Sequence, residues 1–383
     1  MFRDLREFIS AVEKLGELKT VNGVDPHLEM GAIDEVAAES PACPLLVYDN
    51  IKGFPPGFRV ASNLLHTPKR LALALGLELN LNGVDFVRAW KDKVSFEKGA
   101  PPVEVKKAAF QENVFTGKDI NIRQLPSPRW HEHDGGDYFG TAAITIVRDP
   151  DSGYINYGIY RLQTYDNTTL LIQAQASNNL STIRRKYWAK GQNCPVVVCN
   201  SVDPVVWLAG TFYSVPFGLS EYEVAAHLRG APVEVVKGEL TGVPIPAGAE
   251  MALEGEMPPP EVESHDEGPL GEFTGYYSGH VQKAPVIRIK KLMYRNNPIM
   301  HAAPPMKPLP GLYWAGINWR SALIWRDLER AGMTGIKGGL AAQRQPDHHL
   351  PHPAVPRSCQ AGGAGRRYLP QCRYRPLYRP GGR

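Results

Sequence analysis

The short segment DEGPLGE, from Asp266 to Glu272, contains residue types that can do acid–base chemistry. Glu267 and Glu272 flank Gly-Pro-Leu-Gly, in which Pro269 removes a backbone donor and the glycines permit a sharp reversal. We therefore expect the two carboxylates to converge. Close carboxylates separate their proton affinities, so one can donate a proton while the other stays ionised. The segment predicts acid–base catalysis, with a surface acidic turn as the alternative interpretation.

A second candidate is NYGIYR, which runs from Asn156 to Arg161. Residues five apart on a strand point to opposite faces, so these two side chains are expected to have different neighbours. A guanidinium group at this position can hold a substrate carboxylate with two parallel hydrogen bonds. A structural salt bridge is the more common role of such an arginine.

Two further patterns give weaker predictions. In WHEHDGGDYFG, His131 and His133 have HxH spacing and Asp134 and Asp137 lie nearby, a set that can bind zinc or iron. An HxH in a glycine-rich loop more often forms a polar turn, and the next histidine is His227, so we favour the turn. The chain has no Walker-type or GxGxxG loop, which argues against a nucleotide bound in the Rossmann manner.

Composition limits the class of protein. The 383 residues, 43% of them hydrophobic, are enough for two or three domains. No apolar run is long enough to span a bilayer, and we expect a cytoplasmic protein without membrane contact. Five cysteines without CxxC pairing fit a reducing compartment and are interpreted as packing residues. Residues 331–383 contain nine basic residues and one acidic residue. Since the whole chain has a net charge of +4, residues 1–330 are net acidic.

The elements that must position these residues fall into successive regions. DLREFISAVEKLGEL predicts an amphipathic helix, and TPKRLALALGL predicts another that Thr67 caps and Pro68 begins. With the short apolar runs between them, these helices predict an α/β domain over residues 1–105.

Residues 106–315 alternate strand-like segments with turn signals, which predicts a β-barrel or sandwich. TAAITIVRDPDSGYINYGIYRLQTYD should turn at residues 149–153, and its second strand should present one face with alternating residues, namely Ile155, Tyr157, Ile159 and Arg161. YRNNPIM should continue the strands of this region. LSEYEVAAHLRG is its one clear helix, opened by Ser220 with Glu223 completing a capping box.

The end of the chain differs in texture. WRSALIWRDLERAGMTG predicts a helix that leads into a third domain, which begins at residues 316–337. Residues 338–383 are rich in Pro, Arg and Gly, lack helical or strand periodicity, and are predicted to form an irregular basic tail.

Five segments, in this order, resemble the UbiD-type decarboxylases that use prenylated FMN. They are FRDLREFI with EKLGEL, HDGGDYFGTAAITIVRDPDSGYINYGIYR, PFGLSEYEVAAHLRGAPVEVVK, EGPLGEFTGYYSG and YRNNPIM, and the resemblance covers residues 1 to about 337. It implies an α+β fold, with an N-terminal α/β domain followed by a split β-barrel flavin-binding domain. It also implies that the family's C-terminal α/β domain is largely missing here, and we interpret the tail as a truncated or out-of-frame version of it.

The resemblance implies a carboxy-lyase that removes CO₂ from, or adds it to, an aromatic or α,β-unsaturated carboxylic acid. Arg161 would hold the substrate carboxylate, with Glu267 as its ionised partner, and Glu272 would deliver a proton to the carbon that lost CO₂. The flavin would serve as the electron sink. A flavin prenyltransferase would supply the cofactor, and a homo-oligomer is expected.

The resemblance also assigns residues to the cofactor and to a metal ion. The positions implied to contact the flavin are Asn156, Ile159, Tyr160, Arg161, Ser214, Pro216 and Glu221. Asn156 and Glu221 would bind the metal, and Asn179 stands where the family usually supplies a histidine. Oxygen donors suit Mn²⁺ or Mg²⁺, with K⁺ as a further ion.

Two other classes of protein remain open. One is a catalytically impaired, flavin-binding remnant of the family, but the joint presence of Arg161, Glu267 and Glu272 favours the enzyme. The other is a nucleic-acid binder that uses the arginine-rich tail and its tyrosines. The acidic body disfavours that class, so we expect no nucleic-acid partner.

Overall fold

The structure of the protein, a computed structural model, describes residues 1–81, 83–94, 99–212, 215–272, 275–278, 281–306 and 311–337. Within these residues the chain is mixed α and β, as predicted. A ten-stranded sheet and a four-stranded sheet carry most of the strands. None of the helices in the described ranges has both the length and the apolar character that a membrane span requires.

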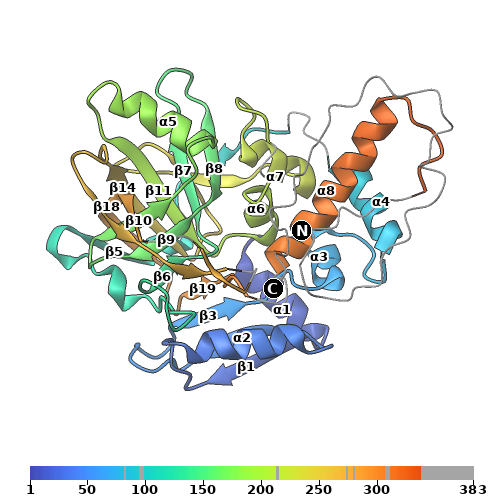
Figure 1. Cartoon of the computed structure of the whole chain (residues 1–383), viewed down its shortest axis with the longest axis horizontal. Coiled ribbons are helices and arrows are strands. Elements are labelled where there is room, and N and C mark those ends of the chain that lie inside the picture. Colours follow the sequence, from blue (N-terminus) through green and yellow to red (C-terminus); the bar gives the residue numbers. More distant parts are fainter. Residues whose placement is uncertain are drawn as a thin grey trace, which may run out of the picture. The chain divides into compact units, whose positions relative to one another are not determined.

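The N-terminal region forms the four-stranded sheet, which lies below the larger sheet in Figure 1. Its strands, in order across the sheet, are β1 (Leu18–Asn22), β2 (Leu45–Asp49), β3 (Arg59–Ser62) and β19 (Ile299–His301). The helices of this region are α1 (Leu5–Lys14), α2 (Glu29–Glu39), α3 (Pro68–Leu75) and α4 (Gly83–Lys93). Strand β19, from YRNNPIM, pairs in parallel with β3. The expectation that this segment is strand-like is confirmed, but its strand belongs to the four-stranded sheet and not to the larger one.

Local signals explain the helices of the N-terminal region. Asp4 caps α1 by accepting a hydrogen bond from the Glu7 amide, and the apolar stripe of the helix is buried as predicted. Thr67 caps α3 and Pro68 occupies its first turn, which confirms the sequence prediction. Gly76 ends α3 with φ +64°, a conformation that glycine adopts without strain.

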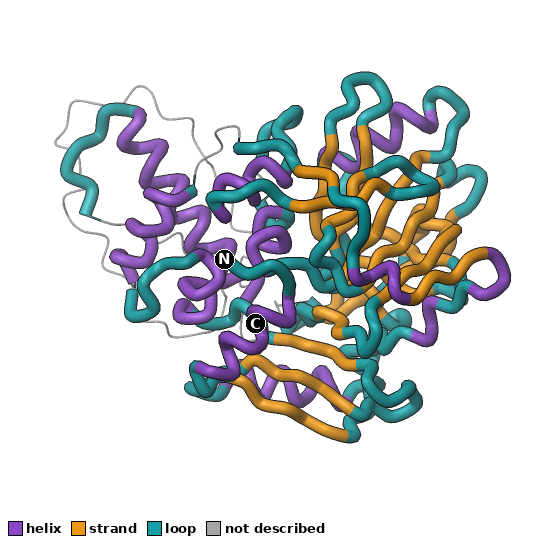
Figure 2. Tube along the Cα trace, turned by 180° about the vertical axis from the view of Figure 1, so that it is seen from behind, coloured by secondary structure: helices purple, strands orange, loops and turns teal. Residues whose placement is uncertain are grey.

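The ten-stranded sheet is strongly curled (Figures 1 and 2). Its main path is β6 (Tyr138–Gly140), β9 (Arg161–Thr164), β10 (Thr169–Gln173), β18 (Gln282–Tyr294), β14 (Met251–Met257), β11 (Cys194–Asn200), β7 (Ile144–Arg148) and β8 (Ile155–Ile159). Two more strands pair with β18, namely β5 (Asn113–Thr116) and β15 (Ser264–Glu267). All of these pairings are antiparallel, as expected of a sheet built from hairpins.

Smaller elements complete the described chain. A three-stranded sheet contains β13 (Pro244–Pro246), β12 (Glu234–Lys237) and β4 (Val103–Glu104), and a two-stranded hairpin contains β16 (Leu270–Gly271) and β17 (Tyr277–Ser278). Three 3₁₀ turns are η1 (Ala109–Glu112), η2 (Gly117–Asp119) and η3 (Ile122–Gln124). Helix α8 (Gly311–Arg330) forms where a helix was predicted and lies beside α4 in Figure 1.

The β-rich region contains more helices than the sequence analysis expected. The predicted helix is α7 (Glu221–Arg229), and its Ser220–Glu223 capping box is present. The expectation of a single clear helix was wrong, because α5 (Asn179–Trp188) and α6 (Pro204–Ala209) also form. The signals were there, since Asn178 and Asp203 cap these helices and α6 begins with a proline.

The β7–β8 hairpin confirms the predicted strand, turn and strand, with Val147 opposite Asn156. Strand β8 ends at Ile159, and β9 begins at Arg161 with different partners, β6 and β10. The prediction that Arg161 shares a face with Ile155 was therefore wrong, because the chain changes strand at Tyr160.

Both faces of the large sheet are covered. Neighbouring β7 residues Ile146 and Val147 belong to two different hydrophobic clusters, which is the alternation that a strand buried on both faces requires. Helices α6 and α7 contribute to the first cluster and α5 to the second. Cys43, Cys194 and Cys199 are buried free thiols, which agrees with their interpretation as packing residues.

Candidate active site

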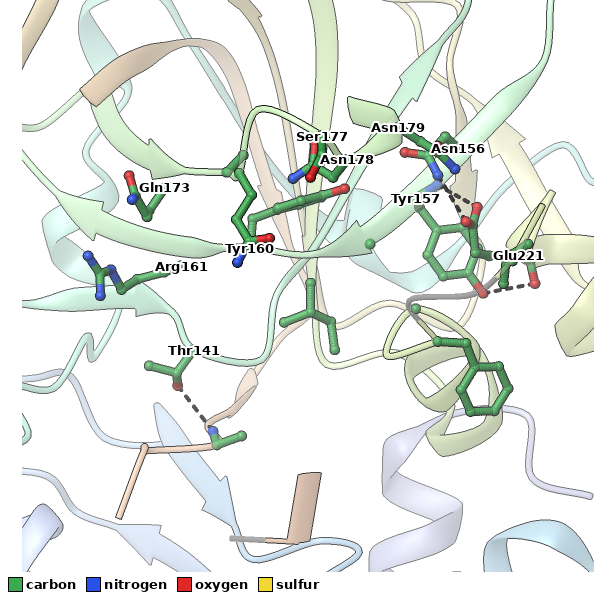
Figure 3. Close-up of a pocket in the computed structure, with 18 of the residues that line it drawn as sticks. Thr141, Asn156, Tyr157, Tyr160, Arg161, Gln173, Ser177, Asn178, Asn179 and Glu221 are labelled. Atoms are coloured by element: carbon green, nitrogen blue, oxygen red, sulfur yellow. Dashed lines mark hydrogen bonds between the residues drawn. The ribbon is translucent and has the colours of Figure 1, made fainter. Parts of the chain in front are cut away.

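A cavity of about 520 Å³ opens between β8, β9, the start of α5 and the start of α7. Strand β8, Tyr160 and the first residue of β9 form one wall, so Asn156 and Arg161 both line it. Figure 3 shows Arg161 at one end of this cavity and Asn156 with Glu221 at the other. The expectation that Asn156 and Arg161 have different neighbours is confirmed, and the same cavity connects them.

The first end of the cavity is built around a buried ion pair. The Arg161 Nη2 atom lies 2.7 Å from Glu267 Oε2, and Arg161 Nη1 lies 3.5 Å from Glu272 Oε1. The Glu267 side chain is fully buried, whereas that of Glu272 is 27% exposed and lines the cavity. The predicted convergence of the two carboxylates is therefore confirmed, with the guanidinium group between them. One carboxylate is locked to the arginine, and the other faces the space where a ligand can bind.

Neutral groups hold Glu267 from its other side. The Tyr138 hydroxyl lies 3.2 Å from Glu267 Oε1, and burial, with the charge of Glu267, raises the pKa of that phenol. Gln163 accepts a hydrogen bond from the Gly268 amide at 2.9 Å. Gly268 has φ +81°, so a side chain there would be strained. These contacts fix the turn that places Glu267 under Arg161.

The WHEHDGG loop packs against this turn. Asp134 accepts hydrogen bonds from the amides of Trp130, His131 and Gly271, and His131 lies against Gly271. No group of three or more His, Cys, Asp or Glu side chains with metal-binding geometry occurs in the described ranges. The preferred interpretation of the HxH pattern as a polar turn agrees with this arrangement.

The opposite end of the cavity is built around Glu221, the first residue of α7. Its carboxylate accepts hydrogen bonds from Asn156 Nδ2 and from the Tyr157 amide, both at 2.9 Å. Burial raises the pKa of Glu221 to about 8, since these donors only partly replace water around the charge. Within the described residues, no Lys, Arg or His forms an ion pair with Glu221.

The donors at this end fit a metal ion. Asn156 Oδ1 is buried and has no hydrogen-bond partner among the described residues, although its Nδ2 is engaged by Glu221. Asn179, at the start of α5, lines the same end of the cavity, together with Ser177 and Asn178 (Figure 3). A buried carboxylate and amide oxygens form a hard-cation donor set. The residues present therefore fit the divalent ion that the family resemblance implied.

Only some of the remaining positions that were predicted to contact the cofactor line the cavity. Ile159 and Tyr160 line the cavity. Pro216 is exposed and is not among the lining residues, whereas its neighbour Val215 is. Ser214 lies outside the described residues.

Several cavity residues escaped the sequence analysis. Gln173 on β10 pairs with Arg161, and Gln282 on β18 pairs with Glu267, so the strand register brings two amides beside the ion pair. Gln175, in the loop before α5, lines the cavity as well. Strand pairing reveals Gln173 and Gln282, and none of the three residues lies in a recognisable motif.

Comparison with protein families places this fold and site in a known group. Residues 102–308 match the model of the 3-octaprenyl-4-hydroxybenzoate carboxy-lyase Rift-related domain, and residues 9–90 match that of the N-terminal domain of the same proteins. The first match alone covers more than half of the chain. The protein belongs to the UbiD family.

Named relatives and solved structures agree with this family. A phenolic acid decarboxylase from Bacillus subtilis is 36% identical over 307 residues, which are 78% of this chain and 63% of the relative. A pyrrole-2-carboxylic acid decarboxylase from Pseudomonas aeruginosa is 32% identical over 305 residues, 78% of this chain and 60% of the relative. The chain thus spans less than two thirds of the length of these relatives.

Two solved structures are similar over 86% of this chain. Vanillic acid decarboxylase from Sedimentibacter hydroxybenzoicus, in its closed form, has a TM-score of 0.79 and 30% identity, and 70% of it is covered. An evolved dimeric form of the UbiD-class enzyme HmfF from Pelotomaculum thermopropionicum, in complex with prFMN, has a TM-score of 0.76 and 28% identity, and 73% of it is covered.

Proposed function

We propose that this protein is a carboxy-lyase that decarboxylates aromatic carboxylic acids with prenylated FMN bound in the cavity. The observation that carries the proposal is the Arg161–Glu267 ion pair, with Glu272 on the cavity side of the same guanidinium group. The similarity to decarboxylases of phenolic and pyrrole carboxylic acids, and to a UbiD-class enzyme in complex with prFMN, supports the substrate and cofactor classes.

Arg161 is suited to orient an incoming carboxylate. Its guanidinium group is largely buried, and one edge is engaged by Glu267, so its position is fixed before the substrate binds. The planar fork can form two parallel hydrogen bonds with a carboxylate group. Glu267 keeps the charge of the arginine balanced, which limits the desolvation penalty of burying it.

Glu272 is suited to deliver the proton. Its carboxyl group reaches the cavity, where it can protonate the carbon that has lost CO₂. When bound, the flavin supplies an electron sink for the negative charge that develops at that carbon. The chain's own part is to hold the acid near that carbon and to align the carboxylate that leaves.

The far end of the cavity is suited to anchor the cofactor. Asn156, Asn179 and Glu221 would hold a Mn²⁺ or Mg²⁺ ion, because all three line this end of the cavity and offer oxygen donors. A K⁺ ion at the same end, a flavin prenyltransferase as the source of the cofactor and self-association of the chain are parts of the same proposal.

The first test is to purify the protein after co-expression with a flavin prenyltransferase and to record its absorption spectrum and the mass of the released ligand. We expect one prenylated FMN per chain and CO₂ release from phenolic or pyrrole carboxylic acids. Glu272→Gln should keep the cofactor and lose at least about 100-fold in turnover, since general acid catalysis contributes roughly 10²–10⁴-fold. A protein that binds no flavin when Mn²⁺ and K⁺ are supplied contradicts the proposal.

A further inference from the structure

The β16–β17 hairpin carries Glu272 directly after β16, so the position of this carboxyl group depends on how the hairpin is held. The two strands pair only with each other within the described residues. Gly271 faces Tyr277 in the register, and the Glu272 amide donates to the Tyr276 carbonyl at 2.9 Å. An isolated two-stranded hairpin is marginally stable in water. Contacts with another part of the chain must therefore fix it.

The loop of residues 130–135 makes several of these contacts. Asp134 Oδ1 accepts from the Gly271 amide at 2.8 Å, immediately before Glu272. The Gly135 amide donates to the Pro269 carbonyl at 2.7 Å, and the His133 amide donates to the Tyr277 hydroxyl at 3.1 Å. The loop thus holds β16 on one side of the turn and β17 on the other.

Close packing accompanies these hydrogen bonds. A Cβ atom added at Gly135 would lie 2.2 Å from the Gly268 carbonyl oxygen, and one added at Gly271 would lie 2.5 Å from His131 Nδ1. At Gly135 the two backbones therefore meet directly, whereas Gly271 lies against the His131 side chain. The His131 and His133 rings also lie against the Tyr277 ring, with centroids 6.4 Å and 5.4 Å away.

Asp134 is the centre of this arrangement. Its side chain is 1% exposed, and Oδ2 accepts from the Trp130 and His131 amides at 3.2 and 2.9 Å, while Oδ1 is left for Gly271. One carboxylate therefore closes its own loop with one oxygen and holds the hairpin with the other. An amide cannot satisfy both sides, because its NH₂ group is a donor and would face another donor.

We propose that Asp134 is a positioning residue, whose carboxylate holds the β16–β17 hairpin and thereby keeps Glu272 at the cavity. This inference rests on the proposed function for the role of Glu272, but the docking itself does not. A displacement of about 1 Å at a reacting group can cost roughly 10²-fold in rate. Loosening the hairpin should therefore lower turnover more than it lowers the affinity for the substrate.

The test is amide hydrogen exchange on the full chain, measured by mass spectrometry, for wild type, Asp134→Asn and Asp134→Ala. We expect peptides that contain Gly271 to exchange at least about 10-fold faster in Asp134→Ala, since a buried amide loses its acceptor, and an intermediate effect in Asp134→Asn. Peptides from β11 and β14 should be unchanged. Wild-type exchange at Gly271 in Asp134→Ala, or equal acceleration throughout the chain, overturns the proposal.

Glu254→Gln is the matched control. Glu254 is also a buried carboxylate that holds a turn through backbone amides, those of Glu239, Leu240 and Thr241, and it lies outside the cavity. Its substitution should accelerate exchange at residues 239–241 and leave Gly271 unchanged. If Glu254→Gln loosens the Gly271 peptide as much as Asp134→Ala does, the effect is general destabilisation and the proposal is wrong.

A second variant covers the case in which Asp134→Ala does not fold. Tyr277→Phe removes the acceptor of the His133 amide at a residue that is 38% exposed, where substitution should be tolerated. It should accelerate exchange at His133 and at residues 277–278 only, and wild-type exchange there contradicts the docking.

Turnover separates this inference from the proposed function. With the cofactor loaded, Asp134→Asn should lower kcat roughly 10- to 100-fold and change KM less than about twofold. If Glu272→Gln retains full turnover while Gly271 exchange responds to Asp134, the docking stands and the role of Glu272 is wrong. If Gly271 exchange does not respond while Glu272→Gln is inactive, the decarboxylase proposal stands and the positioning role fails.

Discussion

The two ends of the cavity differ in the groups that surround their buried carboxyl side chains. At one end, Glu267 is fully buried and is paired with Arg161 at 2.7 Å, so protein groups alone balance the charges. At the other end, Glu221 is equally enclosed but has amide donors and no cation among the described residues. The first end is balanced by protein groups, and at the second we propose that a metal ion supplies the positive charge. A charge that other protein groups already balance suits a residue that acts on the substrate. A carboxyl group with no protein cation beside it suits the binding of a metal ion.

The largest effect should follow from removing the Arg161–Glu267 ion pair. Arg161→Ala should lower kcat/KM for decarboxylation by about 1000-fold or more, because it removes the carboxylate clamp and leaves Glu267 buried without a counter-charge. The same change should lower the free energy of unfolding by about 3–5 kcal/mol. CO₂ release and chemical denaturation measure the two effects.

Arg148→Ala is the control for that variant. Arg148 lies at the end of β7 and donates to the Gly242 carbonyl, away from the cavity. Its loss should leave decarboxylation within about twofold of wild type, as expected for a substitution remote from the site. If Arg161→Ala keeps more than a tenth of wild-type activity, the arginine does not hold the substrate.

The next largest effect should appear at the Glu221 end of the cavity. Glu221→Gln should weaken Mn²⁺ binding by roughly 100-fold in flavin-free protein, since it replaces the carboxylate that we propose as a ligand with a neutral amide. Electron paramagnetic resonance titration measures the affinity without any reaction. Glu223→Gln is the control, because it keeps the capping box of α7 and does not line the cavity. Equal Mn²⁺ affinity in wild type and Glu221→Gln would place the metal elsewhere.

A smaller effect should sharpen the assignment of Asn179. Asn179→His should raise Mn²⁺ affinity about 10-fold, because a neutral imidazole nitrogen binds divalent transition metals better than an amide oxygen does. Thr182→Ser, on α5 but not among the residues that line the cavity, keeps the hydroxyl that donates to the Asn178 carbonyl and should leave the affinity unchanged. If the histidine variant binds Mn²⁺ no more tightly, Asn179 does not face the ion.

The smallest effect uses a buried carboxylate that is remote from both ends. Asp34 is fully buried, accepts a hydrogen bond from Ser62, and burial raises its pKa from 3.8 to about 7. The folded state therefore keeps the proton that the unfolded chain releases. Its contribution to stability is complete below pH 4 and is lost as the pH rises from about 4 to 7.

Asp34→Asn should flatten this part of the stability profile, which urea denaturation at pH 4.5, 6 and 7.5 can measure. Burial lowers the pKa of His66 and His301 to about 4 and about 3, so they destabilise the fold as the pH falls. Both histidines are present in wild type and variant, so the difference between the two profiles isolates Asp34. Parallel profiles would mean that Asp34 is ionised in the folded protein.

Local signals made much of the fold predictable. The capping residues Thr67 and Ser220, and the alternation of the β7–β8 hairpin, are encoded within a few residues and were confirmed. The placement of β19 beside β3 was missed, because it depends on a pairing between segments more than 230 residues apart, Ile299 with Arg59. Sequence periodicity identifies a strand but does not name its neighbours.

In the candidate site, too, local sequence signals predicted some residues, whereas strand pairing was needed for others. The convergence of Glu267 and Glu272 could be predicted, because Gly and Pro force the turn between them. The amides of Gln173 and Gln282 could not, since only the register of β10 and β18 brings them to the cavity. The position of Arg161 depends both on the local sequence and on the pairing of distant strands, because the chain changes from β8 to β9 at Tyr160.

The continuous stretch from Asn156 to Arg161 has a genetic consequence. Five residue steps of extended chain span at most about 18 Å, and this one segment links the two ends of the cavity. An inserted or deleted residue inside it would change that span and turn the following side chains to the opposite face. Among laboratory-generated variants, substitutions within the segment should be recoverable at several positions, whereas single-codon insertions and deletions there should abolish function.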